Sequence, residues 1–125
     1  MSAVIWLIAA LQAKHAVCDF CLQTNVMLAD KGRYGGSGGL IHVGFHGLGT
    51  LLALLFFAPL GIVLALLIVL AEMVFHYHLD WGKERLNAVL GYTPSDLGFW
   101  VLIGGDQALH QWTYLVIAAL AITAG

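Results

Sequence analysis

Long apolar stretches, interrupted by only a few polar positions, dominate this chain of 125 residues. Four such stretches cover residues 3–29, 40–58, 59–80 and 96–124. Each is close to or above the roughly 20 residues that a helix needs to cross a bilayer core. We therefore predict an all-α, integral membrane protein, in which residues 1–125 form a single transmembrane domain folded as an up-down four-helix bundle.

Glycine and proline indicate where the helices end. The glycine-rich segment 32–39 predicts a flexible connection, which is either a lid over a site or a plain linker. Pro59 predicts a tight turn and suits the first turn of the third helix. Ahead of the fourth helix, either Ser95 or Asp96 is expected to be the cap.

Four pairs of polar residues stand inside these apolar stretches, each with the spacing i,i+4. They contain five of the six histidines and three of the seven acidic residues. Because four residues make about one helical turn, each pair presents both side chains on one helix face. Ionisable groups in membrane helices are costly and usually face a shared interior where they serve a function. The pairs are His15/Asp19, His42/His46, His76/Asp80 and Asp106/His110.

The positions of these pairs place them at one level of an up-down bundle. At about 1.5 Å per residue, one histidine of each pair lies near 20 Å from the same end of the bundle. The order within the pairs also agrees, so that His15, His46, His76 and His110 form one layer. The second layer, nearer the opposite face, contains Asp19, His42, Asp80 and Asp106. We expect these side chains to converge.

Imidazole and carboxylate ligands together suit Zn²⁺, Fe²⁺ or Mn²⁺, and helical bundles hold two-metal sites of this kind. We predict one or two divalent ions, with zinc favoured over iron and manganese. A bound ion lowers the pKa of a water ligand, which could then attack an ester, amide or phosphoester. The candidate ligands are His15, Asp19, His42, His46, His76, Asp80, Asp106 and His110.

Two acidic residues are candidates for the catalytic base, Asp106 and Glu72. Glu72 lies one turn from His76 on the same stripe, and pairing with Lys14 explains it equally well. Gln23 and Gln107 suit outer contacts to the ligands, although helix–helix hydrogen bonds would also account for them. His78 points about 200° away from His76 around its helix, which predicts a position outside the site.

Composition supports a membrane protein, because 61% of the residues are hydrophobic, only 10% are charged and the mean hydropathy is +0.90. The net charge of −2 argues neither for nor against a charged partner, and the lack of a basic patch argues against a nucleic-acid partner. Lys31, Arg33, Lys83 and Arg85 all fall between the predicted spans in two connections. The positive-inside rule places these basic loops in the cytoplasm and both termini outside an inner or plasma membrane.

The ordered set of motifs resembles the family of small membrane proteins catalogued as domain of unknown function 3307. The resemblance rests on the segments 15–24, 42–46, 76–83 and 106–110, and it implies a fold with little about function. The His-x-x-x-Asp motif on an apolar helix is also similar to that of membrane-bound metal-dependent hydrolases. This second similarity implies hydrolysis. Separately, a site in a membrane bundle leads us to expect a lipid-like or membrane-surface substrate.

Two other functions use the same residues. A transporter of divalent metal or protons would need access from both faces, and a structural or interaction protein would use the polar core only to fix helix register. The structural alternative predicts that Asp106→Asn preserves function, whereas an enzyme would lose activity while still folding. The sequence leaves the substrate and the oligomeric state open.

Overall fold

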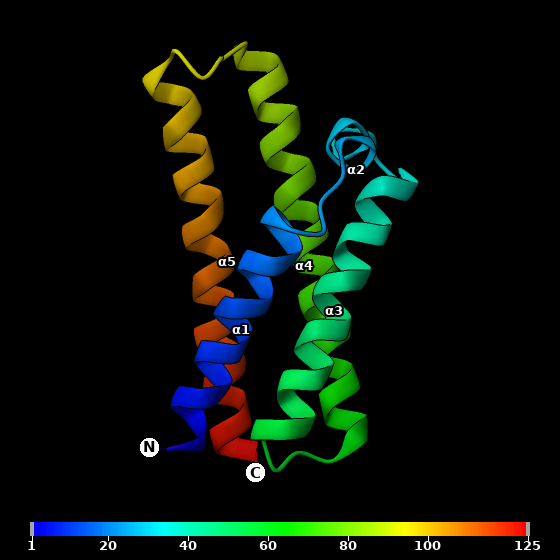
Figure 1. Cartoon of the computed structure of the whole chain (residues 1–125), viewed down its shortest axis with the longest axis vertical. Coiled ribbons are helices and arrows are strands. Elements are labelled where there is room, and N and C mark those ends of the chain that lie inside the picture. Colours follow the sequence, from blue (N-terminus) through cyan, green and yellow to red (C-terminus); the bar gives the residue numbers. More distant parts are fainter. Residues whose placement is uncertain (1, 125) are drawn as a thin grey trace.

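The computed structural model describes residues 2–124, which form helices joined by short loops and contain no strand. The helices are α1 (Ala3–Phe20), α2 (Asn25–Asp30), α3 (Ser37–Phe57), α4 (Ile62–Leu90) and α5 (Leu97–Ala124). The four long helices pack in the cyclic order α1, α3, α4, α5, and the start of α1 lies beside the end of α5 (Figure 1). The all-α prediction is therefore confirmed.

Three of the helices, α1, α3 and α4, are long and apolar enough to cross a membrane. α5 has 28 residues, but its middle carries Asp106, Gln107, His110 and Gln111, which lower its hydropathy. The outer surface of the bundle is covered with exposed apolar side chains such as Phe56 at 78% exposure, while ionisable residues within the long helices, such as His46, Glu72 and Asp80, are buried. This inversion is typical of a protein in lipid. The fourth span stays a prediction.

Two helix ends differ from the sequence prediction. The first helix stops at Phe20 and not at residue 29, because Thr24 starts the separate helix α2 and its hydroxyl accepts the Met27 N–H at 3.3 Å. The third long helix continues past residue 80 to Leu90. The intervening Lys, Glu, Arg and Leu residues are good helix formers, and Gly91 ends the helix with a positive φ of 68°.

The predicted place of Pro59 inside the third long helix is also wrong, since α4 begins at Ile62 with Gly61 as its cap. Ala58, directly before the proline, has an extended backbone with φ −124° and ψ 131°. Proline disfavours the helical conformation in the residue before it, which ends α3 at Phe57. Asp96 does directly precede α5, as expected, and its carboxylate accepts hydrogen bonds from Thr93.

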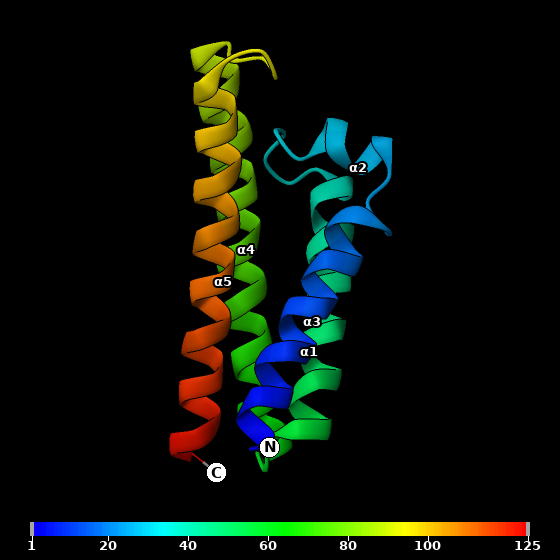
Figure 2. The same ribbon diagram turned by 60° about the vertical axis from the view of Figure 1, so that its left-hand side comes forward.

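The bundle has an apolar half and a polar half. The half near the chain ends has a hydrophobic core made by Leu7, Leu11, Ala53, Leu54, Ala65, Ile68, Val69, Tyr114, Ile117, Ala118 and Ala121. In the other half, α1 and α3 diverge from α4 and α5 towards the end that carries α2 (Figure 2). The buried polar residues lie between these two helix pairs.

Candidate metal centre

Five histidine side chains from four helices converge in the polar half. The ring centroid of His76 lies 4.0 Å from that of His46 and 4.1 Å from that of His110. His15 is 5.2 Å from both His46 and His110, and His42 is 4.6 Å from His46. All five residues are at most 2% exposed. The convergence predicted from the i,i+4 pairs is thus present in the fold.

Asp19 of α1 joins three of these histidines. Its Oδ1 lies 3.0 Å from Nε2 of His46 and 3.4 Å from Nε2 of His42, while its Oδ2 lies 3.2 Å from Nε2 of His15. Because His42 and His46 are on α3, this one carboxylate connects two helices through three imidazoles.

Asp80 of α4 has the corresponding position on the other side. Its Oδ2 lies 3.3 Å from Nε2 of His42 and 3.5 Å from Nε2 of His76, and its Oδ1 lies 3.7 Å from Nε2 of His110. The two aspartates therefore flank the histidine cluster, and His42 lies close to both of them.

The side chains form two overlapping groups whose ligand atoms lie within 4.8 Å of one another. One group contains His76, Asp80 and His110, and the other adds to His76 the residues Asp19, His42 and His46. Each group supplies the imidazole and carboxylate ligands that zinc, iron and manganese accept. A shared His76 between two groups is compatible with the expectation of one or two ions, and metal binding itself stays a prediction.

Nδ1 of His42, Nδ1 of His76 and Nε2 of His110 have no hydrogen-bond partner among residues 2–124. Nε2 of His42 and Nε2 of His76 lie 3.3 to 3.5 Å from carboxylate oxygens, without the geometry of a hydrogen bond. Nδ1 of His110 donates to the backbone carbonyl of Asp106 at 2.8 Å, which leaves Nε2 free to face the cluster. Metal-ligating histidines are commonly held in this way through their second nitrogen. Hydrogen bonds within the described part of the protein therefore do not satisfy all the imidazole nitrogens of the cluster.

The structure places His15 and Asp106, two predicted ligands, outside the two groups. Both ring nitrogens of His15 are used, since Nδ1 lies 2.7 Å from the Tyr114 hydroxyl and Nε2 donates to Oε1 of Gln107 at 2.9 Å. Gln107 also donates to Oδ2 of Asp19 at 3.2 Å, so His15 and Gln107 together help to hold the Asp19 carboxylate in place. Asp106 lies at the cavity, and its Oδ1 has no hydrogen-bond partner in the described part of the chain.

Glu72 lies deeper in the bundle and reaches the histidines only through Lys14. Nζ of Lys14 donates to Oε1 of Glu72 at 2.6 Å and lies 3.2 Å from Nδ1 of His46. The same ammonium lies 4.7 Å from the centre of the Tyr114 ring, where a cation–π interaction adds to its stabilisation. The alternative in which Glu72 pairs with Lys14 is confirmed, and its catalytic role stays a prediction.

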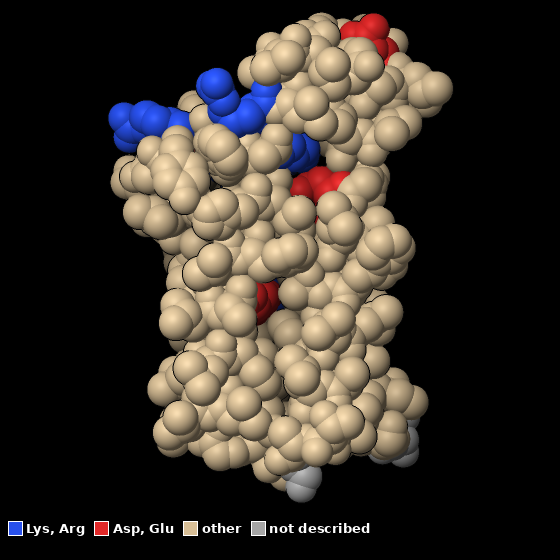
Figure 3. All heavy atoms as spheres, turned by 180° about the vertical axis from the view of Figure 1, so that it is seen from behind, with Lys and Arg blue, Asp and Glu red and all other residues tan. Residues whose placement is uncertain are grey.

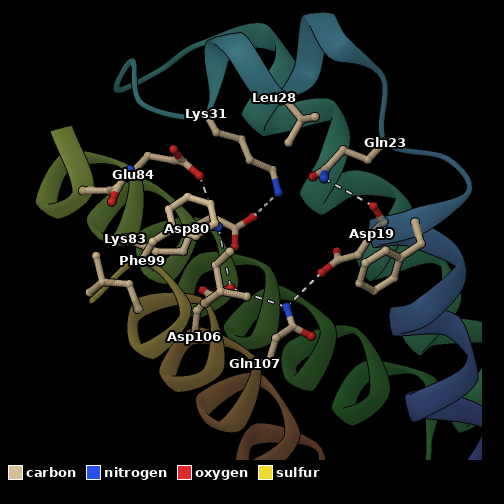
Figure 4. Close-up of a pocket in the computed structure, with 14 residues that line it drawn as sticks. Asp19, Gln23, Leu28, Lys31, Asp80, Lys83, Glu84, Phe99, Asp106 and Gln107 are labelled. Atoms are coloured by element: carbon tan, nitrogen blue, oxygen red, sulfur yellow. Dashed lines mark hydrogen bonds and ion pairs between the residues drawn. The ribbon is translucent and has the colours of Figure 1, made fainter. Parts of the chain in front are cut away.

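A cavity of about 340 Å³ lies above the cluster, between the two helix pairs (Figure 4). Asp19, Asp80, Asp106 and Gln107 line it, so the carboxylates that contact the histidines also face this space. The remaining lining residues are Phe20, Gln23, Leu28, Lys31, Lys83, Glu84, Asn87, Phe99, Leu102 and Ile103. A small molecule in the cavity would touch the carboxylates of the candidate centre directly.

Lys31 is a cavity residue that the sequence did not indicate, because it precedes a glycine-rich segment and was assigned to a basic loop. It is 5% exposed, and its Nζ lies 2.8 Å from Oδ2 of Asp80. The segment 32–39 folds tightly: Gly38 N–H donates to Oδ2 of Asp30 at 2.7 Å, and a Cβ on Gly38 would lie 2.9 Å from Cα of Met27. The glycines thus allow α2 to close against α3, so the segment is no plain linker.

Tyr114 was also missed, although it follows His110 by four residues and so continues the polar stripe of α5. His78, predicted to lie outside the site, is exposed and contacts the Tyr34 hydroxyl at 2.9 Å. Gln23 donates to the backbone carbonyl of Asp19 at 3.3 Å, next to the cavity.

With this geometry in place, the comparisons with known proteins give one result. A family model described as "Protein of unknown function (DUF3307)" matches residues 7–125. The chain belongs to the DUF3307 family. The match includes all four polar pairs, and neither a curated protein nor a solved structure matches the chain. Membership in DUF3307 assigns no activity, so the similarity to membrane-bound hydrolases stays an expectation.

Proposed function

We propose that this DUF3307 protein is a membrane-embedded, metal-dependent hydrolase whose histidine and aspartate cluster binds one or two divalent ions. The observation that carries the proposal is the set of unpartnered imidazole nitrogens on His42, His76 and His110, buried beside a cavity. Each of the three histidines belongs to a group whose ligand atoms lie within 4.8 Å of one another, and imidazole is a common metal ligand.

The unpartnered nitrogens count against a metal-free polar core. Buried polar groups in folded proteins nearly always have a hydrogen-bond partner, and a half-satisfied network in a low-dielectric interior is costly. A network that served only to hold helices together would be expected to pair its imidazoles internally, as His15 does with Tyr114 and Gln107. A divalent ion would satisfy several of these nitrogens at once.

The cavity favours catalysis by water. A bound divalent ion supplies Lewis acidity and a water ligand of lowered pKa. Asp106 lines the cavity, and its buried Oδ1 has no hydrogen-bond partner among the described residues, which makes Asp106 the best-placed base to accept the water proton. The described lining residues include no serine, threonine or cysteine, so direct attack by water is favoured over a covalent intermediate.

The apolar half of the bundle favours an enzyme over a transporter. Beyond the cluster, tightly packed residues such as Leu11, Leu54 and Ala118 close the interior towards the chain ends. The Lys14–Glu72 pair is the one buried ion pair that the structure describes on that side of the histidines, and a transit path would need more polar groups. Access from one face suits a substrate that enters and leaves by the same route.

The basic side chains indicate which face that is. Lys and Arg residues gather at the end of the molecule that carries α2, and the opposite end shows none on the face seen in Figure 3. By the positive-inside rule, this end would lie in the cytoplasm. The cavity would therefore open at the cytoplasmic surface of the membrane, where a lipid-like or membrane-surface substrate could reach it.

Metal content measured by mass spectrometry tests the proposal on protein purified in mild detergent without chelator. We expect one or two equivalents of Zn, Fe or Mn in the wild type, and a lower metal content in His46→Ala, which removes a residue of one candidate ligand group. His78→Ala is the matched control, because it removes an exposed histidine of the same chain outside the cluster. Folded wild-type protein without metal would contradict the proposal.

Activity towards chromogenic esters and phosphoesters then tests the role of Asp106. We expect Asp106→Asn to keep the metal and to lose activity by about 10²- to 10⁴-fold, the usual contribution of a general base. Unchanged turnover in a metal-loaded Asp106→Asn protein would remove Asp106 from the reaction and favour a structural role for the polar core.

A further inference from the structure

The cavity above the cluster contains two ammonium groups that the candidate metal centre does not need. Lys31 reaches it from the end of α2, and Lys83 reaches it from α4. Nζ of Lys31 lies 2.8 Å from Oδ2 of Asp80, and Nζ of Lys83 lies 3.1 Å from Glu84 and 3.8 Å from Asp106. Each ammonium has three N–H donors, so both can donate to a further acceptor in the cavity.

The charge balance of the cavity depends on metal. Four carboxylates line it, those of Asp19, Asp80, Glu84 and Asp106, against the two lysines. Without a cation, this surplus of negative charge repels an anion. One divalent ion balances the surplus and a second reverses it, because bound cations are the largest local charges in such a site. With metal bound, the cavity no longer carries a net negative charge, so the two lysines and the ions together can attract an anion.

The walls of the cavity are apolar, whereas its floor is charged. Phe20 and Leu28 lie on the side of α1 and α2, while Phe99, Leu102 and Ile103 come from α5. Figure 4 shows Leu28 above the level of Asp19 and Gln107. A ligand that fills this space would place a charged group on the floor and an apolar portion against the walls.

We propose that the cavity binds a phosphate monoester group, with Lys31 and Lys83 holding its oxygens over the metal centre. The two ammonium groups approach from the end of α2 and from α4, and the ions would lie below. A tetrahedral group with three free oxygens can meet all of them, whereas a carboxylate has only two. Lysine is a common phosphate ligand as a point charge. This inference rests on the proposed hydrolase and names its substrate class.

The corresponding reaction balances without another reactant. A water oxygen forms a bond to phosphorus, and the bond between phosphorus and the ester oxygen breaks. One water proton passes through Asp106 to the leaving alkoxide, so the products are an alcohol and inorganic phosphate. Lys31 and Lys83 keep their protons throughout and act by binding and orienting the phosphoryl oxygens.

Phosphate binding to the full-length, zinc-loaded protein in nanodiscs tests the inference, with inorganic phosphate as the calorimetric probe. We expect binding that disappears when the metal is removed, and that weakens about tenfold in Lys31→Gln and in Lys83→Gln, since one charge-assisted hydrogen bond is lost. Arg85→Gln is the matched control, because it removes the same charge from an exposed position of α4 that does not line the cavity.

Two further measurements keep the result interpretable. Lys31→Arg retains the charge and should restore binding, which separates loss of the cation from damage to the fold around α2. In a competition experiment, phosphatidic acid in the nanodisc is compared with inorganic phosphate as a ligand of the same cavity. If phosphatidic acid occupies the cavity at the lower concentration, the natural ligand is a lipid headgroup. If inorganic phosphate does so, the natural ligand is a soluble phosphoester. Both results support the phosphate site.

The failures are distinguishable. Wild-type protein without metal overturns the proposed hydrolase, and this inference with it. Metal-loaded protein that binds neither inorganic phosphate nor phosphatidic acid overturns this inference alone. The same holds if Lys31→Gln and Lys83→Gln keep their metal and bind phosphate as tightly as Arg85→Gln.

Discussion

The two halves of the bundle are built by the same four helices but are held together by different interactions. Near the chain ends, the interior consists of apolar side chains such as Leu11, Leu54 and Ile117, and packing sets the positions of the helices. Near α2, the helices separate, and the interior contains imidazoles, carboxylates and ammonium groups. The apolar half thus acts as the scaffold that holds the polar half open.

This difference explains how so apolar a fold can tolerate so many buried charges. Each buried ammonium lies near a carboxylate, as in the Lys14–Glu72 and Lys31–Asp80 pairs at 2.6 and 2.8 Å. The charges are costly one by one but are compensated in pairs. A mutation in the apolar half should therefore act through lost packing, and one in the polar half through an uncompensated group.

The largest effect on stability is expected from Glu72→Gln, which leaves the ammonium of Lys14 buried beside His46 without its carboxylate. Removing one partner of a buried ion pair costs about 3–5 kcal/mol of unfolding free energy. The double variant Lys14→Met/Glu72→Gln should recover most of that loss, because the orphaned charge is gone. Unfolding titrations with sodium dodecyl sulfate measure both, and equal stabilities of the single and the double variant would contradict this account.

A comparable loss is expected in the apolar half from Leu54→Ala, where the side chain is 0% exposed. Large-to-small substitutions in a packed core cost about 2–5 kcal/mol, because a cavity is left behind. The metal content per folded protein should remain that of the wild type. A changed metal stoichiometry in folded Leu54→Ala protein would show that the two halves are not independent.

Within the polar half, two histidine variants should differ in metal stoichiometry. His76 belongs to both candidate ligand groups, whereas His110 belongs to one. We expect His76→Ala to lose all bound metal, with affinity reduced at least about 100-fold, since even outer contacts contribute 10- to 100-fold. His110→Ala should keep one ion where the wild type holds two. Identical metal contents in the two variants would contradict the arrangement in two groups.

The smallest effect on stability is expected from the protonation of Asp96, which lies outside both halves, directly before α5. The Asp96 carboxylate accepts hydrogen bonds from the N–H of Thr93 at 2.8 Å and from its hydroxyl at 2.9 Å, which lowers the pKa of Asp96 below its ordinary value. Because the folded pKa is lowered, the stabilisation is present above the ordinary carboxyl pKa of about 3.9 and is lost as the pH falls through the lowered pKa.

The Thr93 amide shift in NMR spectra reports this titration directly. We expect its midpoint below that of an unperturbed aspartate, and Asp96→Asn should remove the titration while the rest of the bundle is unchanged. A midpoint at or above the ordinary value would mean that the Thr93 hydrogen bonds do not form in solution.

Much of the candidate site could be predicted because helical geometry is local. The i,i+4 spacing of pairs such as His42/His46 fixes a shared helix face, and the up-down order brings four such faces to one level. The helix boundaries were less predictable. Pro59 and Thr24 act through backbone preferences at single residues, and the polar stretch after residue 80 looks like a loop by hydropathy although its residues favour a helix.

By itself, the sequence determined the all-helical fold, the apolar exterior and the convergence of five histidines, because each follows from the period of a helix and the cost of charge in lipid. Only the tertiary structure decided that Lys31 pairs with Asp80 and that Lys14 pairs with Glu72. It also decided that Tyr114 and Gln107 form hydrogen bonds with the two ring nitrogens of His15. These contacts join residues far apart in the chain, and no local periodicity specifies which side chain meets which. They depend on how far the two helix pairs diverge, which the packing of the apolar half sets.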